Sequence, residues 1–438
     1  MKQKLIVLAI LGALVGTAQA QSVQDLQQAL AQAQKAAADA QKAAQQAMAA
    51  LEQIQQATVK QQQVADAAKE NKSVTQPAGE GLVYRNGDDS VRLYGLIDLS
   101  MSNKSNADKT GKTQSDMSVA WFSGNRWGIE GEHGLKDTDG LKAIFKLESE
   151  YELPTGNMDS PGVLFNRDAW LGVQSDSLGK LTLGRQNTVA REFSKIYGDP
   201  YGTAAVTLEE GGYTNNNNFK QFIFYSGSAT GTRYDKGIVW KKEIGEFVAG
   251  VGYQVGGVPG DNTTGSSKTV ALAYNGGAKN AAGFYTSANV NGYTHTAYSL
   301  GGNVQYGLLR FNAGYVSYKA EQPAALGDRT EKAYTVSAKF TPAGKFDYEL
   351  GWQTMNATNA AVNGSGYVIN AFGNTSAATA TASGKRKTWY GSAFYHFDKR
   401  TELYLALDRL NTDGKYLAAQ ANGFTSQNEY AVGMRFKF

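Results

Sequence analysis

The side chains that most often perform catalysis are few and scattered in this sequence. Its 438 residues include three histidines, His133, His295 and His396, and no cysteine. The wide separation of the histidines argues against a metal cluster or a Ser/His/Asp triad, and thiolate chemistry is excluded. The Gly-Val-Gly segment at 250–252 lies within an expected strand that no helix follows, so it is not a phosphate-binding loop. The sequence therefore predicts no cofactor and no metal site, and it does not favour an enzyme.

The last segment of the chain is the most informative element. From Ser426 to Phe438, apolar residues occupy every second position: Tyr430, Val432, Met434, Phe436 and Phe438. Strict alternation indicates a β-strand with one apolar face. A soluble sandwich also has such strands, but a chain that ends on a strand of this kind with a terminal Phe is typical of outer-membrane barrels. Their assembly machinery reads that terminus, so Phe438 is the candidate assembly signal.

The first twenty residues have the features of a secretory signal peptide. Lys2 and Lys4 precede an apolar run from Leu5 to Val15, and Ala18-Gln19-Ala20 fits a cleavage site. The apolar run is too short to span a bilayer. We therefore expect residues 1–20 to be removed on export.

Residues 21–70 predict a separate helical module on the periplasmic side. They contain neither Gly nor Pro, and apolar residues recur at alternating spacings of three and four, which is typical of a coiled coil. Alanine dominates the middle of this seam and buries little area, so we expect the coil to depend on a tethering oligomer. A disordered polar tail is the alternative. Residues 71–90, which contain a proline and several glycines, are the expected linker.

The composition of the remaining chain favours membrane strands over membrane helices. After the signal no run of eighteen apolar residues occurs, and the mean hydropathy is -0.41. The chain has 24 Tyr, 18 Phe and 50 Gly, a mixture expected where strands face lipid on one side and water on the other. The net charge of +4 is too small to indicate nucleic-acid binding.

Residues 91–438 predict an all-β fold, an antiparallel transmembrane β-barrel of about sixteen strands. The strands are expected near 91–102, 119–133, 140–152, 165–175, 178–187, 234–242, 246–256, 268–276, 282–291, 296–306, 309–319, 331–341, 345–356, 386–397, 401–410 and 426–438. Residues 217–226 look like a further strand, but counting them would place short turns on both sides of the membrane. We therefore assign them to a long connection, 188–232, that folds into the lumen and narrows it.

Several segments closely resemble the Gram-negative general porins, particularly the neisserial and β-proteobacterial branch. They are VRLYGLID at 91–98, NRWGIEG at 125–131, GLKAIFKLE at 140–148, FNRDAWLG at 165–172, LTLGRQ at 181–186 and VGMRFKF at 432–438. The resemblance covers about residues 91–438 and implies a homotrimer of sixteen-stranded barrels whose third external loop folds into the lumen. The helical arm departs from the family pattern, and between the inserted loop and residue 400 the spacing matches better than the sequence.

Charged residues of the lumen are the candidate site. Alternation along 140–152 turns Lys146 toward water inside the barrel. By the resemblance, Arg126 and Arg167 match the basic ladder on one side of a porin constriction, and Arg233 is a weaker match. The opposing acidic side is expected in the long connection, from Glu192, Asp199, Glu209 and Glu210.

A transverse field between these two sets would orient dipolar solutes and select ions by sign. The plainer alternative for each residue is a solvated lumen charge or a salt bridge between barrel and loop. Where general porins can carry a lysine after the first Tyr-Gly, this chain has Leu96, which weakens the case for strong anion selectivity.

The resemblance therefore implies an outer-membrane porin, a water-filled channel for passive diffusion of ions and small hydrophilic solutes. Its expected partners are outer-membrane lipid, two further copies of the chain and the barrel assembly machinery. One alternative is a substrate-specific channel for an anion such as a dicarboxylate or phosphate. Another is a structural tether in which the coiled coil reaches the peptidoglycan, although no wall-binding motif is recognisable in it.

Overall fold

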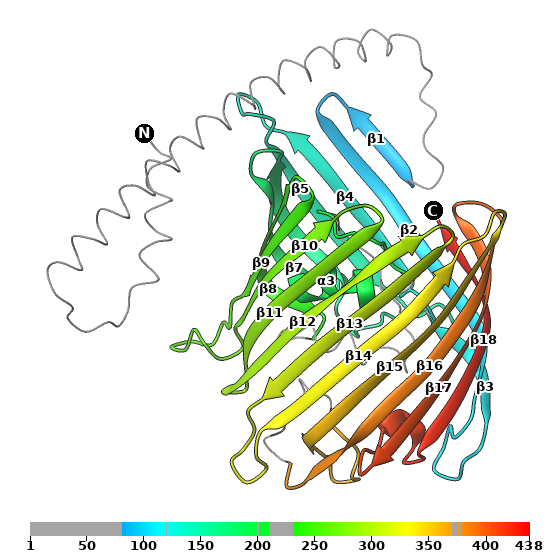
Figure 1. Ribbon diagram of the computed structural model, residues 1–438. Coiled ribbons are helices and arrows are strands. Elements are labelled where there is room, and N and C mark those ends of the chain that lie inside the picture. Colours follow the sequence, from blue (N-terminus) through cyan, green and yellow to red (C-terminus); the bar gives the residue numbers. More distant parts are fainter. Residues whose placement is uncertain (1–80, 120, 199–200, 210–230, 370–374, 376–377) are drawn as a thin grey trace, which may run out of the picture. The chain divides into compact units, whose positions relative to one another are not determined.

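The computed structural model describes residues 81–119, 121–198, 201–209, 231–369, 375 and 378–438 (Figure 1). Contacts divide the chain into two units, 1–76 and 77–438. The expected signal peptide, the coiled coil and the first ten residues of the expected linker lie outside the described residues. Among the described residues, no helix is long and apolar enough to cross a membrane.

The second unit is built almost entirely from antiparallel strands. They are β1 (Leu82–Asn86), β2 (Asp89–Lys104), β3 (Gln114–Val119), β4 (Arg126–Gly134), β5 (Lys142–Glu150), β6 (Asp168–Ser175), β7 (Gly179–Asn187), β8 (Arg233–Ile244), β9 (Phe247–Gln254), β10 (Ser267–Asn275), β11 (Lys279–Val290), β12 (Tyr293–Tyr306), β13 (Leu309–Ala320), β14 (Arg329–Phe340), β15 (Phe346–Ala361), β16 (Thr381–His396), β17 (Thr401–Gly414) and β18 (Ser426–Lys437). The described helices are α3 (Val189–Gly198) and a short 3-10 helix, η1 (Ala419–Ala421).

These strands form a closed ring. Each strand from β4 to β18 pairs with its neighbour in sequence, and β18 pairs with β2, which closes the sheet. β3 and β4 share one position, because β3 pairs with the second half of β2 and β4 with the first half. The ring is therefore a sixteen-stranded antiparallel barrel, and the predicted fold class and strand count are confirmed.

Strands β15, β16 and β17 extend further towards the long-loop end than expected, and two other differences change how the wall is built. The strand expected at 119–133 is interrupted: residues 121–125 leave the wall between β3 and β4. The expected linker also ends earlier, since β1 lies at 82–86 and forms a hairpin with the start of β2. The turn between them contains Gly87 with a φ of 59°, a backbone conformation that glycine adopts at little cost.

The connections sort by length to the two ends of the barrel. The short turns expected at 175–179, 243–246, 307–308, 342–344 and 398–400 all lie at the end where β18 finishes. At the other end most connections are long, and the exception is the two-residue turn Asn291-Gly292, in which both residues have positive φ as a type I′ hairpin requires. β7 pairs directly with β8, so the wall closes without a strand from residues 217–226, which lie outside the described residues.

The two faces of the wall differ in the manner of a membrane barrel. Along β17, Leu405 is 53% exposed whereas the preceding Tyr404 is 2% exposed. The same alternation leaves aliphatic side chains outward on most strands. Exposed aromatic side chains gather near the short turns: Phe247, Tyr274, Tyr306, Phe340, Phe346, Tyr348 and Phe397. Such a band is typical of a membrane interface.

Candidate functional site

The connection between β7 and β8 begins with α3, which lies inside the ring (Figure 1). Thr188 caps the helix, because its Oγ1 accepts a hydrogen bond from the backbone N–H of Arg191 at 3.2 Å. The helix packs against strands β9 to β14. Its apolar side chains are fully buried there: Val189, Ala190, Phe193, Ile196 and Tyr197. The lumen of this side of the barrel is therefore filled by protein.

Small residues in the wall make room for this helix. A Cβ added at Gly301 or Gly314 would overlap the ring of Tyr197. The hydroxyl of Tyr197 also shares a hydrogen bond of 2.5 Å with Ser299. Because these two glycines of β12 and β13 have no side chain, the helix can approach the sheet backbone closely.

The segment after the helix is held by polar side chains of the wall. Asn303 Nδ2 donates hydrogen bonds to the carbonyl oxygens of Ile196 at 2.8 Å and Ala204 at 2.7 Å. Asn275 exchanges two hydrogen bonds with the backbone of Val206. These contacts satisfy backbone groups of an irregular segment at membrane depth, which is tolerated only where it is buried in protein or lines a water-filled cavity.

The basic residues predicted from the sequence meet in one charged cluster on the inner wall. Arg167 pairs with Glu148 and Glu150, and Arg126 Nη1 lies 4.0 Å from Glu148 Oε1. Lys146 Nζ lies 3.7 Å from Asp168 Oδ2. Two further arginines are electrostatic neighbours of this group: Arg191 on α3 and Arg233 on β8. The cluster thus joins the wall strands β4, β5, β6 and β8 to the start of the inserted loop.

The direct partners of Arg126 and Arg167 are carboxylates of the wall. Glu148 is 3% exposed and Glu150 is 8% exposed, both on β5. Alternation placed Glu148 in the lumen from the sequence, but its pairing with Arg167 depends on how β5 and β6 align. The signal that could have found Glu150 is the same alternation, which puts it on one face with Lys146 and Glu148.

The acidic loop residues have other surroundings. Glu192 accepts a hydrogen bond from Asn187 Nδ2 at 2.8 Å and pairs with Lys195 at 2.9 Å. Burial alone would raise the pKa of Glu192, but nearby cations, chiefly Lys195 and Lys241, outweigh it and lower the pKa to about 2. Glu209 Oε2 lies 3.7 Å from Lys180 Nζ. Asp199 and Glu210 lie outside the described residues.

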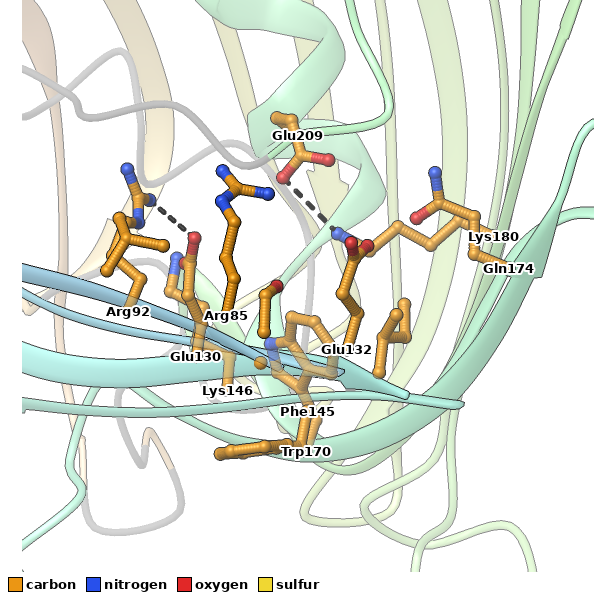
Figure 2. Close-up of a pocket in the computed structure, with 14 residues that line it drawn as sticks. Arg85, Arg92, Glu130, Glu132, Phe145, Lys146, Trp170, Gln174, Lys180 and Glu209 are labelled. Carbon is orange, nitrogen blue, oxygen red and sulfur yellow. Dashed lines mark ion pairs between the residues drawn. The ribbon is translucent and has the colours of Figure 1, made fainter. Parts of the chain in front are cut away.

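A cavity of about 310 Å³ opens beside this cluster, towards the short-turn end (Figure 2). Cations from four strands reach it: Arg85 on β1, Arg92 on β2, Lys146 on β5 and Lys180 on β7. Arg92 pairs with Glu130 at 2.5 Å, and the Lys180 ammonium lies 4.8 Å from the ring centre of Trp170. None of the ion pairs of the described residues includes Arg85, whose side chain extends into the cavity.

The described residues contain no group of three or more His, Asp or Glu side chains arranged to hold a metal ion. The predicted assembly signal, Phe438, forms two backbone hydrogen bonds with Gly95 of β2, at 2.9 and 3.0 Å. It therefore extends the pairing of β18 to the last residue of the chain.

A closed antiparallel barrel with an apolar exterior, a charged interior and an inserted loop defines a transmembrane barrel of the porin type. The family model for the Gram-negative porin matches residues 30–415. The chain therefore belongs to the Gram-negative porin family, and its barrel belongs to the outer membrane.

Individual relatives agree with this assignment. The chain is 30% identical over 263 residues to an outer membrane porin protein of Bordetella pertussis, and the match covers 52% of this chain and 63% of that protein, less than two thirds of its length. The fold is similar to that of an anion-selective porin from Comamonas acidovorans, with a TM-score of 0.61, 21% identity and coverage of 80% of this chain and 100% of the other. OmpT of Vibrio cholerae gives a TM-score of 0.55 at 15% identity, covering 82% of this chain and 100% of OmpT.

Proposed function

We propose that the protein is an outer-membrane porin through which ions and small hydrophilic solutes diffuse passively. The observation that supports this most directly is the sixteen-stranded ring whose β7–β8 connection enters the lumen and packs on the inner wall. A barrel of this strand number leaves an aqueous lumen, and a loop fixed inside it reduces the passage to an aperture. Family membership supports a channel rather than an enzyme.

We further propose that the charged cluster lines this aperture. Arg126 and Arg167, with Lys146 and Arg233, form its basic side, and Arg191 adds a fifth cation. The wall carboxylates beside them are Glu148, Glu150 and Asp168, so the cluster without the acidic residues of the loop has two more positive than negative charges. Glu209, which is 75% exposed at its side chain, is assigned to the acidic side, as are Glu192, Asp199 and Glu210.

Because the acidic residues of the loop are assigned to the other side of the same aperture, the positive charge of the wall cluster is offset across it, which supports weak ion selectivity. The Comamonas protein of similar fold is described as anion-selective. The nearby carboxylates argue against strong ion selectivity. They lie within a few ångströms of the arginines and cancel most of the electric field of these cations.

Assembly of the barrel involves both ends of the mature chain. We infer that the mature chain forms homotrimers, that residues 21–70 add a coiled-coil contact on the periplasmic side, and that Phe438 is read by the barrel assembly machinery. One solved structure of Vibrio OmpT is described as a trimer form. Peptidoglycan is the proposed partner of the arm if it acts as a tether.

Single-channel recording in planar bilayers tests the channel. We expect stepwise conductance and a small reversal potential in a tenfold salt gradient. Gel electrophoresis tests the assembly: we expect a trimer band in samples that are not boiled and a monomer band after boiling. A purified, folded barrel that produces no conductance steps would refute the proposed function.

A further inference from the structure

The interruption between β3 and β4 places aromatic side chains inside the barrel. Residues 121–125, here called the inward turn, leave the wall although both flanking strands pair with β2. Trp121 is 5% exposed and Phe122 is 2% exposed, whereas an apolar residue on the outer face would contact lipid. The inward turn is therefore a built element of the lumen.

Asp98 of β2 holds the inward turn in place. Its Oδ2 accepts hydrogen bonds from the backbone N–H groups of Phe122 at 3.0 Å and Ser123 at 2.9 Å. Its Oδ1 accepts a hydrogen bond from the hydroxyl of Tyr404 at 2.6 Å. Asn125 completes the arrangement, because its Oδ1 accepts the backbone N–H of Asp98. A carboxylate with 0% exposure thus satisfies backbone donors that the interrupted strand leaves unpaired.

The aromatic ring presented by this turn meets the inserted loop. The ring centres of Phe122 and Tyr201 are 4.3 Å apart, and those of Phe122 and Phe394 are 4.9 Å apart. The hydroxyl of Tyr201 shares a hydrogen bond of 2.5 Å with Ser392 of β16. The guanidinium of Arg435 lies 6.0 Å from the ring centre of Phe122. The loop that begins at β7 therefore reaches strand β16 on another part of the wall.

We propose that the inward turn is a latch that fixes Tyr201 and Gly202 of the inserted loop, here called the latched segment, with Phe122 as the contact residue and Asp98 as the residue that positions it. The helical part of the loop is anchored to β9–β14 independently of this contact. Beyond it, the latched segment is held by the aromatic contact, by Ser392 and by a hydrogen bond from Arg310 to the carbonyl of Gly202 at 3.0 Å. The aromatic contact keeps this segment in one position, and that position sets the width of the aperture.

The effect on the aperture rests on the proposed channel function, but the contact itself can be tested without it. Because the chain has no cysteine, one introduced at the exposed Thr203 gives a single attachment site for a nitroxide spin label beside the latched segment. In T203C we expect a broad spectrum typical of an immobile label. In T203C/F122A the spectrum should sharpen, and F122L, which keeps an apolar side chain, should give an intermediate result.

Matched variants distinguish loss of the latch from general destabilisation of the barrel. F311A removes a ring of the same size from the outer face of β13, where Phe311 is 50% exposed, and should leave the label immobile. Y201A removes the other half of the contact without altering the wall, so it keeps the test valid if F122A does not fold. D98A should sharpen the spectrum although Phe122 is retained.

The channel readout is the noise of the open state in planar bilayers. F122A and Y201A should raise this noise several-fold and add brief subconductance levels, while F311A should match the parent. If the label is as immobile in F122A and Y201A as it is in T203C alone, the latch is refuted, irrespective of the conductance measurements. A mobile label with unchanged conductance and noise would refute the claim that the latched segment sets the width of the aperture. If the parent shows no conductance, only the channel function is refuted, because the spin-label spectra test the contact independently.

Discussion

Neutralising Arg167 tests whether the charged cluster lines the conduction path. R167Q removes one positive charge and leaves its two partners, Glu148 and Glu150, without their closest cation. The net charge at the aperture then falls by one unit. We expect R167Q to shift ion selectivity towards cations and to lower stability.

The size of the selectivity shift follows from Coulomb's law. A unit charge about 7 Å from the path contributes roughly 0.6 kcal/mol in water. A screening length of about 10 Å at 0.1 M salt reduces this to about 0.3 kcal/mol. Anion occupancy then falls, and cation occupancy rises, each by a factor of about 1.7. The ratio of anion to cation permeability is therefore expected to drop about threefold in R167Q.

The carboxylate partner provides the matched test. E150Q should shift the permeability ratio about threefold towards anions, because it removes a negative charge from the same place. In R167Q/E150Q the net charge of the cluster returns to that of the parent, so the ratio should return as well. Removing one member of a buried pair costs about 3–5 kcal/mol, and removing both costs less. The thermal midpoint should thus be lowest in R167Q.

Zero-current potentials across a tenfold salt gradient supply the measurement. K109Q, which removes a charge from an exposed loop residue at the long-loop end, should leave the ratio unchanged. Equal ratios in R167Q, E150Q and the parent would show that the cluster does not face the conducted ions. A shift in R167Q that E150Q fails to cancel would show that the change comes from a displaced loop and not from charge.

Helix α3, the terminal Phe438 and the buried Glu192 can each be tested by a single change. G314V should push Tyr197 and the helix α3 from the wall and change single-channel conductance, whereas unchanged conductance would show that the helix can repack. Deleting Phe438, which pairs with Gly95, should reduce surface levels through failed assembly, and normal levels would refute its role as a signal. Glu192 has a pKa of about 2 in the folded protein against an ordinary 4.5, so its contribution to stability should be complete above pH 4.5 and lost as the pH falls towards 2. In E192Q the thermal midpoint should therefore lose part of its pH dependence in that window.

Much of the barrel could be predicted from the sequence because lipid imposes a period of two on every wall strand. Leu405 and Leu407 face outward while Tyr404 and Asp408 are buried, and this pattern can be recognised without knowing which strands are neighbours. The interruption before β4 could not be recognised in this way, because an aromatic residue such as Phe122 is also common within a strand. Its inward position depends on hydrogen bonds from residues far away in the sequence.

The candidate site was predictable in part. Alternation identified Lys146 and the family resemblance identified Arg126 and Arg167, and all three lie in the charged cluster on the inner wall. Their partners depend on strand register, which places Glu150 opposite Arg126 and cannot be read from either strand alone. The anchoring of the loop by Asn303 joins residues separated by about one hundred positions and had no local signal.

The hairpin strand β1 continues the line of β18. Both run antiparallel to β2 on the same edge: Lys437 lies opposite Leu96, Phe438 bonds to Gly95, and Leu82 lies opposite Leu93. Only the place opposite Tyr94 separates the chain end from the start of β1. A circular permutant that joins residue 438 to residue 82 through one glycine, with new ends in the exposed connection 255–266, should therefore keep every wall pairing. With the signal peptide placed before the new first residue, such a chain would carry the ring of Phe438 inside a continuous strand. Its insertion would show that recognition of the ring does not require the end of a strand.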